Sequence, residues 1–281
     1  MTMDQYCVIG NPVAHSQSPW IHARFAELTG QRLHYGRRLV AADGFADAVR
    51  AFAAEGGKGC NVTVPFKFEA QALARRASER ALLAQAANTL SFASDGIVAD
   101  NTDGIGLVRD IEVNAGLALR GRQLLLIGAG GAAAGVLGPL ILCRPAAITV
   151  ANRTPSKAQA LVTRHAPLAS QQQVALQSSA LETIAGSFDL VINGSASSLS
   201  GAGAPVSAST LRHDTLVYDM MYGPAAQGFL AWAQAHGAQA RDGLGMLVEQ
   251  AAEAFCLWRG VRPPSAQVLG ELRQHLAHGE R

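Results

Sequence analysis

The segment Leu124-Leu125-Leu126-Ile127-Gly128-Ala129-Gly130-Gly131-Ala132-Ala133-Ala134-Gly135 joins an apolar run to a glycine-rich turn. Such a junction is typical of a buried parallel strand that leads into a helix. Gly128 and Gly130, with Ala133 in the third place, match the dinucleotide fingerprint: a tight turn, a close backbone approach to a pyrophosphate, and a small residue between helix and strand. The segment therefore predicts a nucleotide site at the start of that helix. A tight turn in any α/β domain is the alternative.

The sequence after Arg120 alternates between short apolar runs and helical patterns. We expect strands at 123–127, 147–151, 188–192 and 215–219, with helices between them. This alternation predicts a parallel sheet with right-handed crossovers, the Rossmann type of nucleotide-binding domain. Residues 196–208, rich in Ser, Ala, Gly and Pro, predict a loop after a strand.

The end of the second of these strands indicates which nucleotide binds. NAD-binding domains carry an acidic residue there, about 20 residues after the glycine loop, to hold the ribose 2′-hydroxyl. This chain has Asn152-Arg153-Thr154 instead, with no acidic residue. A guanidinium forms forked, charge-assisted hydrogen bonds with a phosphate. The predicted cofactor is therefore NADP(H), with a solvated surface arginine as the alternative.

Length and composition exclude several classes of protein. The chain has 281 residues, enough for two domains, and 49% of them are hydrophobic. A net charge of +2 without a dense Lys/Arg run argues against nucleic-acid and membrane partners. The four cysteines form no CxxC pair, and the first residues do not resemble a signal peptide, so we expect a cytoplasmic protein. The stretch 124–143 lacks charges, but its glycines and Pro139 favour strand, turn and helix over a membrane span.

The N-terminal third predicts a second, smaller α/β arrangement. A helix is expected from Ser18 as N-cap, with Pro19 at its first position. The other expected strands are 6–10, 33–40, 59–67 and 87–92, and the other expected helices are 44–55, 70–80, 105–115, 230–236, 246–258 and 263–278.

Polar residues at the ends of these strands are candidates for chemistry. Lys67 follows an apolar strand and a proline, where partial burial would favour its neutral form and help it to exchange a proton. Asp103, in a polar loop, is its candidate partner; a purely structural ion pair is the alternative. Ser16 and Ser18 could bind a carboxylate, or could simply cap the helix. Thr63, Asn88 and Gln250 mean little individually, and the eight histidines show no metal-binding spacing.

The chain resembles the shikimate dehydrogenase family over essentially its whole length, because it carries several motifs of that family in the same order and spacing. The two most specific are Asn61-Val62-Thr63-Val64-Pro65-Phe66-Lys67 and Asn101-Thr102-Asp103-Gly104. The others are 10–19, 87–89, 128–132, 152–154, 218–224 and 243–251. Ala23, Ser195 and Gln227-Gly228 depart from residues common in the family, and none of these departures affects Lys67 or Asp103.

The resemblance implies reversible, NADPH-dependent reduction of 3-dehydroshikimate to shikimate, on the route to chorismate and aromatic amino acids. It implies Lys67 and Asp103 as the catalytic pair. The substrate-binding residues it implies are Ser16, Ser18, Thr63, Asn88, Tyr222 and Gln250. The cofactor-binding residues it implies are Gly128, Ala129, Gly130, Gly131, Ala132, Asn152, Arg153, Thr154 and Gly243, with no metal.

The fold implied by the resemblance is a discontinuous α/β substrate domain facing a Rossmann-type NADP-binding domain across a cleft. The expected limits are 1–104, completed by C-terminal helices in 240–281, and 105–239 for the nucleotide domain. A monomer or a homodimer is expected. Use of quinate or an amino analogue remains open, as does a non-catalytic NADP-binding regulator.

Overall fold

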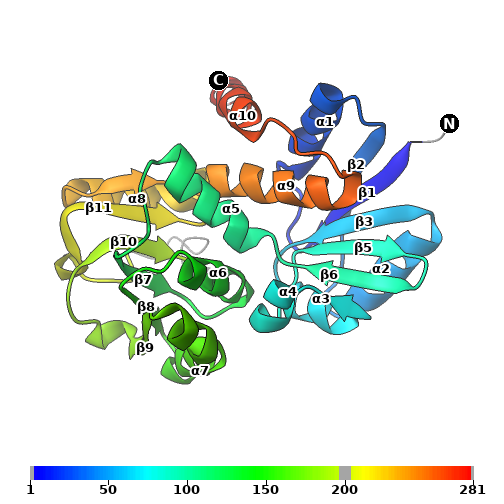
Figure 1. The fold of residues 1–281 in the computed structure, drawn as a ribbon. Coiled ribbons are helices and arrows are strands. Elements are labelled where there is room, and N and C mark those ends of the chain that lie inside the picture. Colours follow the sequence, from blue (N-terminus) through cyan, green and yellow to red (C-terminus); the bar gives the residue numbers. More distant parts are fainter. Residues whose placement is uncertain (1–2, 196–203, 280–281) are drawn as a thin grey trace. The chain divides into compact units, whose positions relative to one another are not determined.

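The computed structural model describes residues 3–195 and 204–279. The chain divides into two compact units (Figure 1): unit 1 comprises Met1–Asp110 and Leu247–Arg281, and unit 2 comprises Ile111–Met246. The predicted domain limits at 104/105 and 239/240 stay a prediction. Residues 196–203, part of the predicted loop 196–208, lie outside the described residues.

Unit 1 contains a mixed sheet. In spatial order its strands are β2 (Leu33–Leu39), β1 (Asp4–Gly10), β3 (Gly57–Val62), β5 (Thr89–Ala93), β6 (Gly96–Asp100) and β4 (Arg76–Ala77). β1 runs parallel to both β2 and β3, whereas β5 and β6 form an antiparallel hairpin beside β3. Ser94 and Asp95 form the turn of this hairpin.

Alternate residues of β1 face two different cores, as the two-residue period of a strand requires. Cys7 and Ile9 belong to a core with α2 (Phe45–Ala54) and α3 (Lys67–Leu73), where Phe45 stacks on Phe66 at 4.9 Å. Tyr6 instead packs against Trp258 of α9 (Leu244–Arg259), with the two rings tilted and their centroids 4.7 Å apart. The remaining helices of this unit are α1 (Ser18–Thr29), α4 (Glu79–Ala84), α5 (Asp103–Arg109) and α10 (Ser265–Gly279).

Unit 2 contains a parallel sheet. In spatial order its strands are β12 (Gln239–Arg241), β11 (Leu211–Asp219), β10 (Phe188–Asn193), β7 (Gln123–Ile127), β8 (Ala147–Asn152) and β9 (Ala175–Ala180). Every recorded pairing in it is parallel. Its helices are the π-helix Asp110–Asn114, which continues α5, then α6 (Gly131–Leu142), α7 (Pro155–Gln172) and α8 (Pro224–Ala235), with single 3₁₀ turns at Leu181–Thr183 and Ala208–Thr210. The four strands predicted for this part are confirmed.

Three local predictions are wrong. Ser18 does not cap α1: the helix begins at Ser18, and its N-cap is Gln17, which makes no side-chain capping bond. The strand expected over 59–67, with a stop at the proline, already ends at Val62, and Lys67 begins the helix α3 instead of directly following a strand. The single helix expected at 70–80 is broken, because residue 74 is extended and the Ser78 hydroxyl caps a new helix by accepting a bond from the Ala81 amide at 3.2 Å.

No helix among the described residues is long and apolar enough to cross a membrane. The uncharged stretch 124–143 is divided between β7 and α6.

Candidate active site and nucleotide site

Lys67 and Asp103 form a close, largely buried ion pair in unit 1. Lys67 is the first residue of α3, and Asp103 is the first residue of α5. The distance from Lys67 Nζ to Asp103 Oδ2 is 2.5 Å, and their side chains are only 14% and 6% exposed. A helix N-terminus is a favourable place for a carboxylate side chain. The pair can hold a proton next to a carboxylate that orients it.

Asn88 fixes the other oxygen of Asp103. Its Nδ2 donates to Asp103 Oδ1 at 2.8 Å. Its Oδ1 accepts a hydrogen bond from the Thr102 backbone N–H at 2.8 Å, which determines how the amide is oriented because a backbone N–H can only donate. The two oxygens of Asp103 are therefore held by two different partners, and the carboxylate is immobilised before a substrate binds.

Gln250 joins this cluster from α9. Its Oε1 accepts from Asn88 Nδ2 at 3.1 Å and from Thr102 Oγ1 at 3.3 Å, while its Nε2 donates to the Leu247 carbonyl at 2.8 Å. The structure thus brings Lys67, Asp103, Asn88 and Gln250 together. Thr102, which was not predicted, completes the cluster; its place inside the Asn-Thr-Asp-Gly motif was the available signal.

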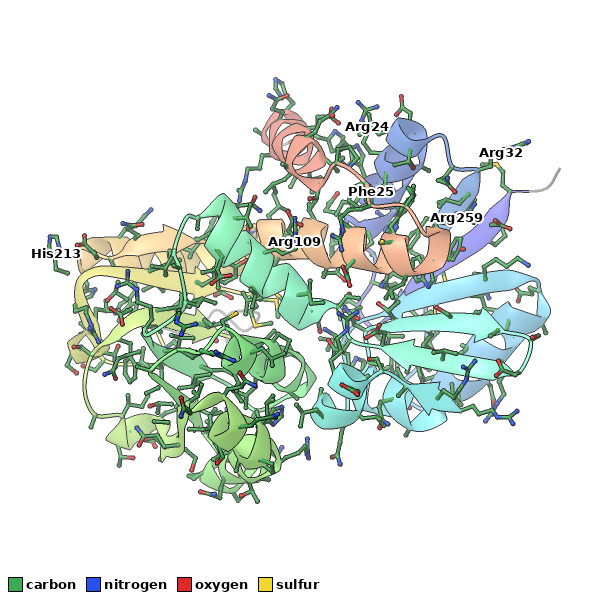
Figure 2. The ribbon with its side chains drawn as sticks, in the orientation of Figure 1. Arg24, Phe25, Arg32, Arg109, His213 and Arg259 are labelled. Carbon is green, nitrogen blue, oxygen red and sulfur yellow. The ribbon has the colours of Figure 1, made fainter. Side chains whose placement is uncertain are left out.

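Two ion pairs hold α9 against the elements that carry this cluster. Arg109, which is labelled in Figure 2, lies at the end of α5 and contacts Glu249, which is 2% exposed, at 3.0 Å. The Ser265 hydroxyl donates to the same carboxylate at 3.0 Å. One turn further along α9, Glu253 lies 3.4 Å from Arg80, which also forms a forked pair with Asp100. These contacts set the position of Gln250 between Glu249 and Glu253.

Ser16 and Ser18 form a second polar site, at the start of α1. Their hydroxyl oxygens lie 3.2 Å apart, and the Ser18 N–H donates to Ser16 Oγ at 3.3 Å. Ser18 is 5% exposed, whereas Ser16 is partly exposed. The Ser16 hydroxyl therefore satisfies the first amide of the helix, so part of the capping interpretation holds. Two adjacent hydroxyls can still donate to a carboxylate from one side.

A buried polar chain, missed in the sequence, begins beside Ser18. The Tyr35 hydroxyl donates to Asn61 Oδ1 at 2.7 Å, and Asn61 Nδ2 donates to the Asn88 carbonyl at 3.1 Å. Burial raises the pKa of Tyr35 well above 10, and the Ser18 hydroxyl acts in the opposite direction. Asn61 is the first residue of the Asn-Val-Thr-Val-Pro-Phe-Lys motif, but Tyr35 lies in a strand without a recognised motif. The chain links the serine site to Asn88 within one unit.

Thr63 contributes to the turn between β3 and α3. Its carbonyl accepts from the Phe66 N–H at 3.1 Å, and its N–H donates to the Ile9 carbonyl at 2.9 Å. Gly10 leaves room for it, since a Cβ at Gly10 would stand 2.3 Å from Thr63 Cγ2. Thr63 is therefore locked to the end of β1, with a partly exposed side chain.

In unit 2, the glycine loop has the shape that a pyrophosphate needs. Gly128 has a φ of +111°, and a Cβ there would meet the Gly194 carbonyl oxygen at 2.9 Å, so a side chain is excluded. A Cβ at Gly130 would meet no atom of the described residues within 4 Å, so there is open space on that side of the residue. α6 begins at Gly131 without a side-chain cap, followed by Ala132, so its first N–H groups remain available to an anion. The loop fits a dinucleotide.

The next strand places Asn152, Arg153 and Thr154 beside this loop, because β7 and β8 are parallel neighbours and both segments follow their carboxyl ends. Asn152 Nδ2 donates to the Thr154 carbonyl at 2.9 Å, which fixes the turn. Arg153 is exposed and forms no ion pair with the described residues. Its guanidinium is therefore free to pair with a phosphate.

Two further predicted site residues follow neighbouring strands of the same sheet. Tyr222 is partly buried and lies after β11. Gly243 lies after β12, and a Cβ there would stand 2.3 Å from the Met220 carbonyl oxygen. Close packing of backbone thus explains this glycine within the structure. The candidate cofactor residues and Tyr222 all belong to unit 2, whereas the cluster around Lys67 belongs to unit 1.

A unit that holds a lysine–carboxylate pair and a second unit with a dinucleotide fingerprint define a nucleotide-dependent oxidoreductase of the two-unit α/β class. Three family models match: the shikimate dehydrogenase substrate binding domain (residues 8–90), shikimate / quinate 5-dehydrogenase (111–204) and the shikimate 5′-dehydrogenase C-terminal domain (243–273). The chain is 65% identical over 276 residues to shikimate dehydrogenase (NADP(+)) of Acidovorax sp. (strain JS42), and the match covers 98% of each. The chain belongs to the shikimate dehydrogenase family.

Solved structures agree with this assignment. An Ael1 enzyme from Pseudomonas putida superposes with a TM-score of 0.87 at 46% identity, covering 96% of this chain and 98% of that one. Shikimate 5-dehydrogenase from Thermus thermophilus, in complex with NADP(H) and shikimate, superposes with a TM-score of 0.84 at 28% identity, covering 97% and 99%. The predicted fold class, with a substrate unit and a Rossmann-type unit, is confirmed.

Proposed function

We propose that this protein catalyses the reversible, NADPH-dependent reduction of 3-dehydroshikimate to shikimate. The observation that carries the proposal is the buried contact between Lys67 Nζ and Asp103 Oδ2 at 2.5 Å, in a chain that is 65% identical to an NADP(+)-dependent shikimate dehydrogenase. A ketone reduction needs a proton donor at the carbonyl oxygen and a hydride donor at the carbonyl carbon. The pair supplies the first, and NADPH, when bound, supplies the second.

Lys67 acts as the general acid. As charge develops on the ketone oxygen, the Lys67 ammonium delivers a proton to it, and Asp103 holds the ammonium and accepts a hydrogen bond from the new hydroxyl. In the oxidation of shikimate, neutral Lys67 takes the proton back. Because Asn88 fixes the second oxygen of Asp103, the carboxylate needs no reorientation during the reaction. Positioned acid–base catalysis of this kind typically contributes about 10²–10⁴-fold.

The remaining substrate residues fall into two groups, according to whether they bind the carboxylate or the hydroxyls of the substrate. Ser16 and Ser18 donate their hydroxyls to the ring carboxylate, and Tyr222 is a further proposed substrate residue. The neutral amides and hydroxyl of Asn88, Gln250 and Thr63 bind the hydroxyls of the ring, for which neutral partners suffice.

The nucleotide residues also fall into two groups, one for the pyrophosphate and one for the 2′-phosphate. The backbone of Gly128 to Ala132 cradles the pyrophosphate at the start of α6, and Arg153, with Asn152 and Thr154, holds the 2′-phosphate. Gly243 is the last of the proposed cofactor residues, and its lack of a side chain permits close backbone packing. The substrate domain comprises 1–104 with 240–281. We expect the protein to work in the cytoplasm as a monomer or a homodimer.

A spectrophotometric assay tests this proposal directly. The purified chain should reduce NADP⁺ in the presence of shikimate, with a kcat/KM at least tenfold above that for quinate or for NAD⁺. Oxidation of quinate with equal efficiency would identify a broader quinate/shikimate dehydrogenase. If the chain binds NADP⁺ but turns over none of these substrates, it is a nucleotide-binding regulator and the proposal is wrong.

A further inference from the structure

Arg37 clasps the backbone of the serine site. It lies on β2, and its guanidinium forms two hydrogen bonds to the carbonyl oxygen of Ser16: Nη2 at 2.6 Å and Nε at 3.1 Å. A fork of this kind fixes both the distance and the direction of its acceptor, which a single hydrogen bond does not. The main chain of Ser16 is therefore anchored to a strand rather than held only by the start of α1.

The charge of Arg37 is not neutralised by a neighbouring carboxylate. Among the residues that the structure describes, no carboxylate oxygen lies within 4.0 Å of its guanidinium. The next residue in the strand differs: Arg38 pairs with Glu55 and lies over the Phe52 ring at 4.4 Å. Successive residues of a strand point to opposite faces, so the two arginines serve different surroundings.

A pair of serine hydroxyls by itself discriminates poorly between a charged ligand and a neutral one. A hydroxyl donates to a carboxylate, but it also donates to the carbonyl of a neutral ester or amide. A nearby positive charge makes the site prefer the carboxylate, because the charge attracts an anion and leaves a neutral ester or amide almost unaffected. Arg37 contacts Ser16, which carries one of the two hydroxyls, and its guanidinium has no carboxylate partner among the described residues.

We propose that Arg37 is a positioning and specificity residue, which holds the Ser16 segment in its binding conformation and makes the serine site selective for a substrate with a ring carboxylate. The inference rests on the proposed function, since it assigns Ser16 and Ser18 to that carboxylate. It predicts that Arg37 acts on substrate binding alone. Proton transfer at Lys67 and nucleotide binding in unit 2 should not depend on it.

The test compares Arg37→Met and Arg37→Lys with the unchanged protein, using shikimate and its methyl ester as substrates. For Arg37→Met, we expect KM for shikimate to rise about tenfold, equivalent to about 1.4 kcal/mol, with kcat and KM for NADP⁺ changed by less than about twofold. For the neutral methyl ester, KM should rise less than it does for shikimate, because the ester loses only the positioning of Ser16 and not the attraction of the charge. Arg37→Lys keeps the charge and should recover part of the loss, and added salt should weaken shikimate binding more in the unchanged protein than in Arg37→Met.

Arg38→Met is the matched control, because it removes the same charge from the other face of the same strand. Its KM for shikimate should stay within about twofold of the unchanged value. An unaltered KM in Arg37→Met would overturn the inference while leaving the proposed function intact. An equal loss for shikimate and its ester would overturn the selectivity for charge. Absence of shikimate oxidation by the unchanged protein would instead contradict the proposed function itself.

Discussion

Lys67 is the residue on which the proposed chemistry depends most directly. Lys67→Ala removes the proton donor but keeps the contact between Asn88 and Asp103. We expect kcat for shikimate oxidation to fall about 10²–10⁴-fold with little change in KM, because acid–base catalysis acts in the transition state. Steady-state kinetics would measure both constants.

Lys58 provides the control for this substitution. It is the second residue of β3, and its side chain is exposed. Lys58→Ala should keep the full kcat. Near-normal turnover in Lys67→Ala would show that another group donates the proton.

Arg153 determines the choice between the two nicotinamide cofactors in our proposal. Arg153→Ala removes a charge-assisted contact to the 2′-phosphate, worth about 1.5–3 kcal/mol. KM for NADP⁺ should therefore rise about 10- to 100-fold, whereas KM for NAD⁺ should barely change. Arg120→Ala, which removes another exposed arginine from the same unit, should alter neither constant. Equal changes for the two cofactors would contradict a 2′-phosphate site at Arg153.

His22 predicts how stability depends on pH. It is fully buried, it stacks on Tyr35 at 4.2 Å, and neither ring nitrogen has a hydrogen-bond partner among the residues that the structure describes. Burial lowers the pKa of His22 from 6.5 to about 3. Above pH 6.5 the ring is neutral in both the folded and the unfolded chain. Below that pH only the unfolded chain gains the proton, so the free energy of unfolding falls by about 1.4 kcal/mol per pH unit until about pH 3.

At pH 5 this loss amounts to about 2 kcal/mol. Urea unfolding of His22→Phe, which cannot titrate, should show a correspondingly smaller difference between pH 7 and pH 5 than the unchanged protein. His34→Phe, at an exposed position on β2, should keep the full difference. Identical pH dependence in His22→Phe and the unchanged protein would show that His22 is protonated in the folded state.

The glycine loop between β7 and α6 separates a structural glycine from a ligand-binding one. Alanine at residue 128 would combine a positive φ with a contact of 2.9 Å to a carbonyl, and it should destabilise the protein by about 1–3 kcal/mol or more. Alanine at residue 130 meets no atom within 4 Å. Gly130→Ala should therefore unfold at nearly the same urea concentration as the unchanged protein, while KM for NADP⁺ rises at least about tenfold because the methyl group occupies the path of the pyrophosphate. An unchanged KM would place the pyrophosphate elsewhere.

Some elements could be predicted from the sequence and others could not, for physical reasons. The central strands of unit 2 are buried on both faces, so they appear as uninterrupted apolar runs. β9 (Ala-Leu-Gln-Ser-Ser-Ala) and β12 (Gln-Ala-Arg) lie at the edges of the sheet, carry polar residues, and were missed. The Ala- and Arg-rich stretch 70–80 favours a helix locally, but Ser78 and the pairing of β4 with β6 divide it. Tertiary contacts outweighed local propensity there.

The candidate site shows the same division. Lys67 and Asp103 carry recognisable motifs, and the structure places them in contact, although their catalytic role stays a prediction. The hydrogen bonds from Tyr35 to Asn61 and from Asn61 to Asn88 join residues that are 26 and 27 positions apart, and no local sequence pattern predicts them. Arg37 was invisible for a similar reason, since its partner is a backbone carbonyl 21 residues away. A hydrogen bond to the main chain leaves no signature in the partner's side chain.

The division of the chain into two units makes a prediction about how the two ligands act. The residues around Lys67, together with Ser16 and Ser18, belong to unit 1, whereas the glycine loop and Arg153 belong to unit 2. A ligand stabilises the part of the chain that it contacts, by about 2.7 kcal/mol at a concentration 100-fold above its dissociation constant. Amide hydrogen exchange should therefore slow at 128–135 and 152–157 with NADP⁺ alone, and at 16–18, 61–67 and 88–103 with shikimate alone. Gly130→Ala should weaken the first effect and keep the second, whereas Arg37→Met should weaken the second and keep the first. Protection of 128–135 by shikimate alone would show that the glycine loop contributes to the substrate site.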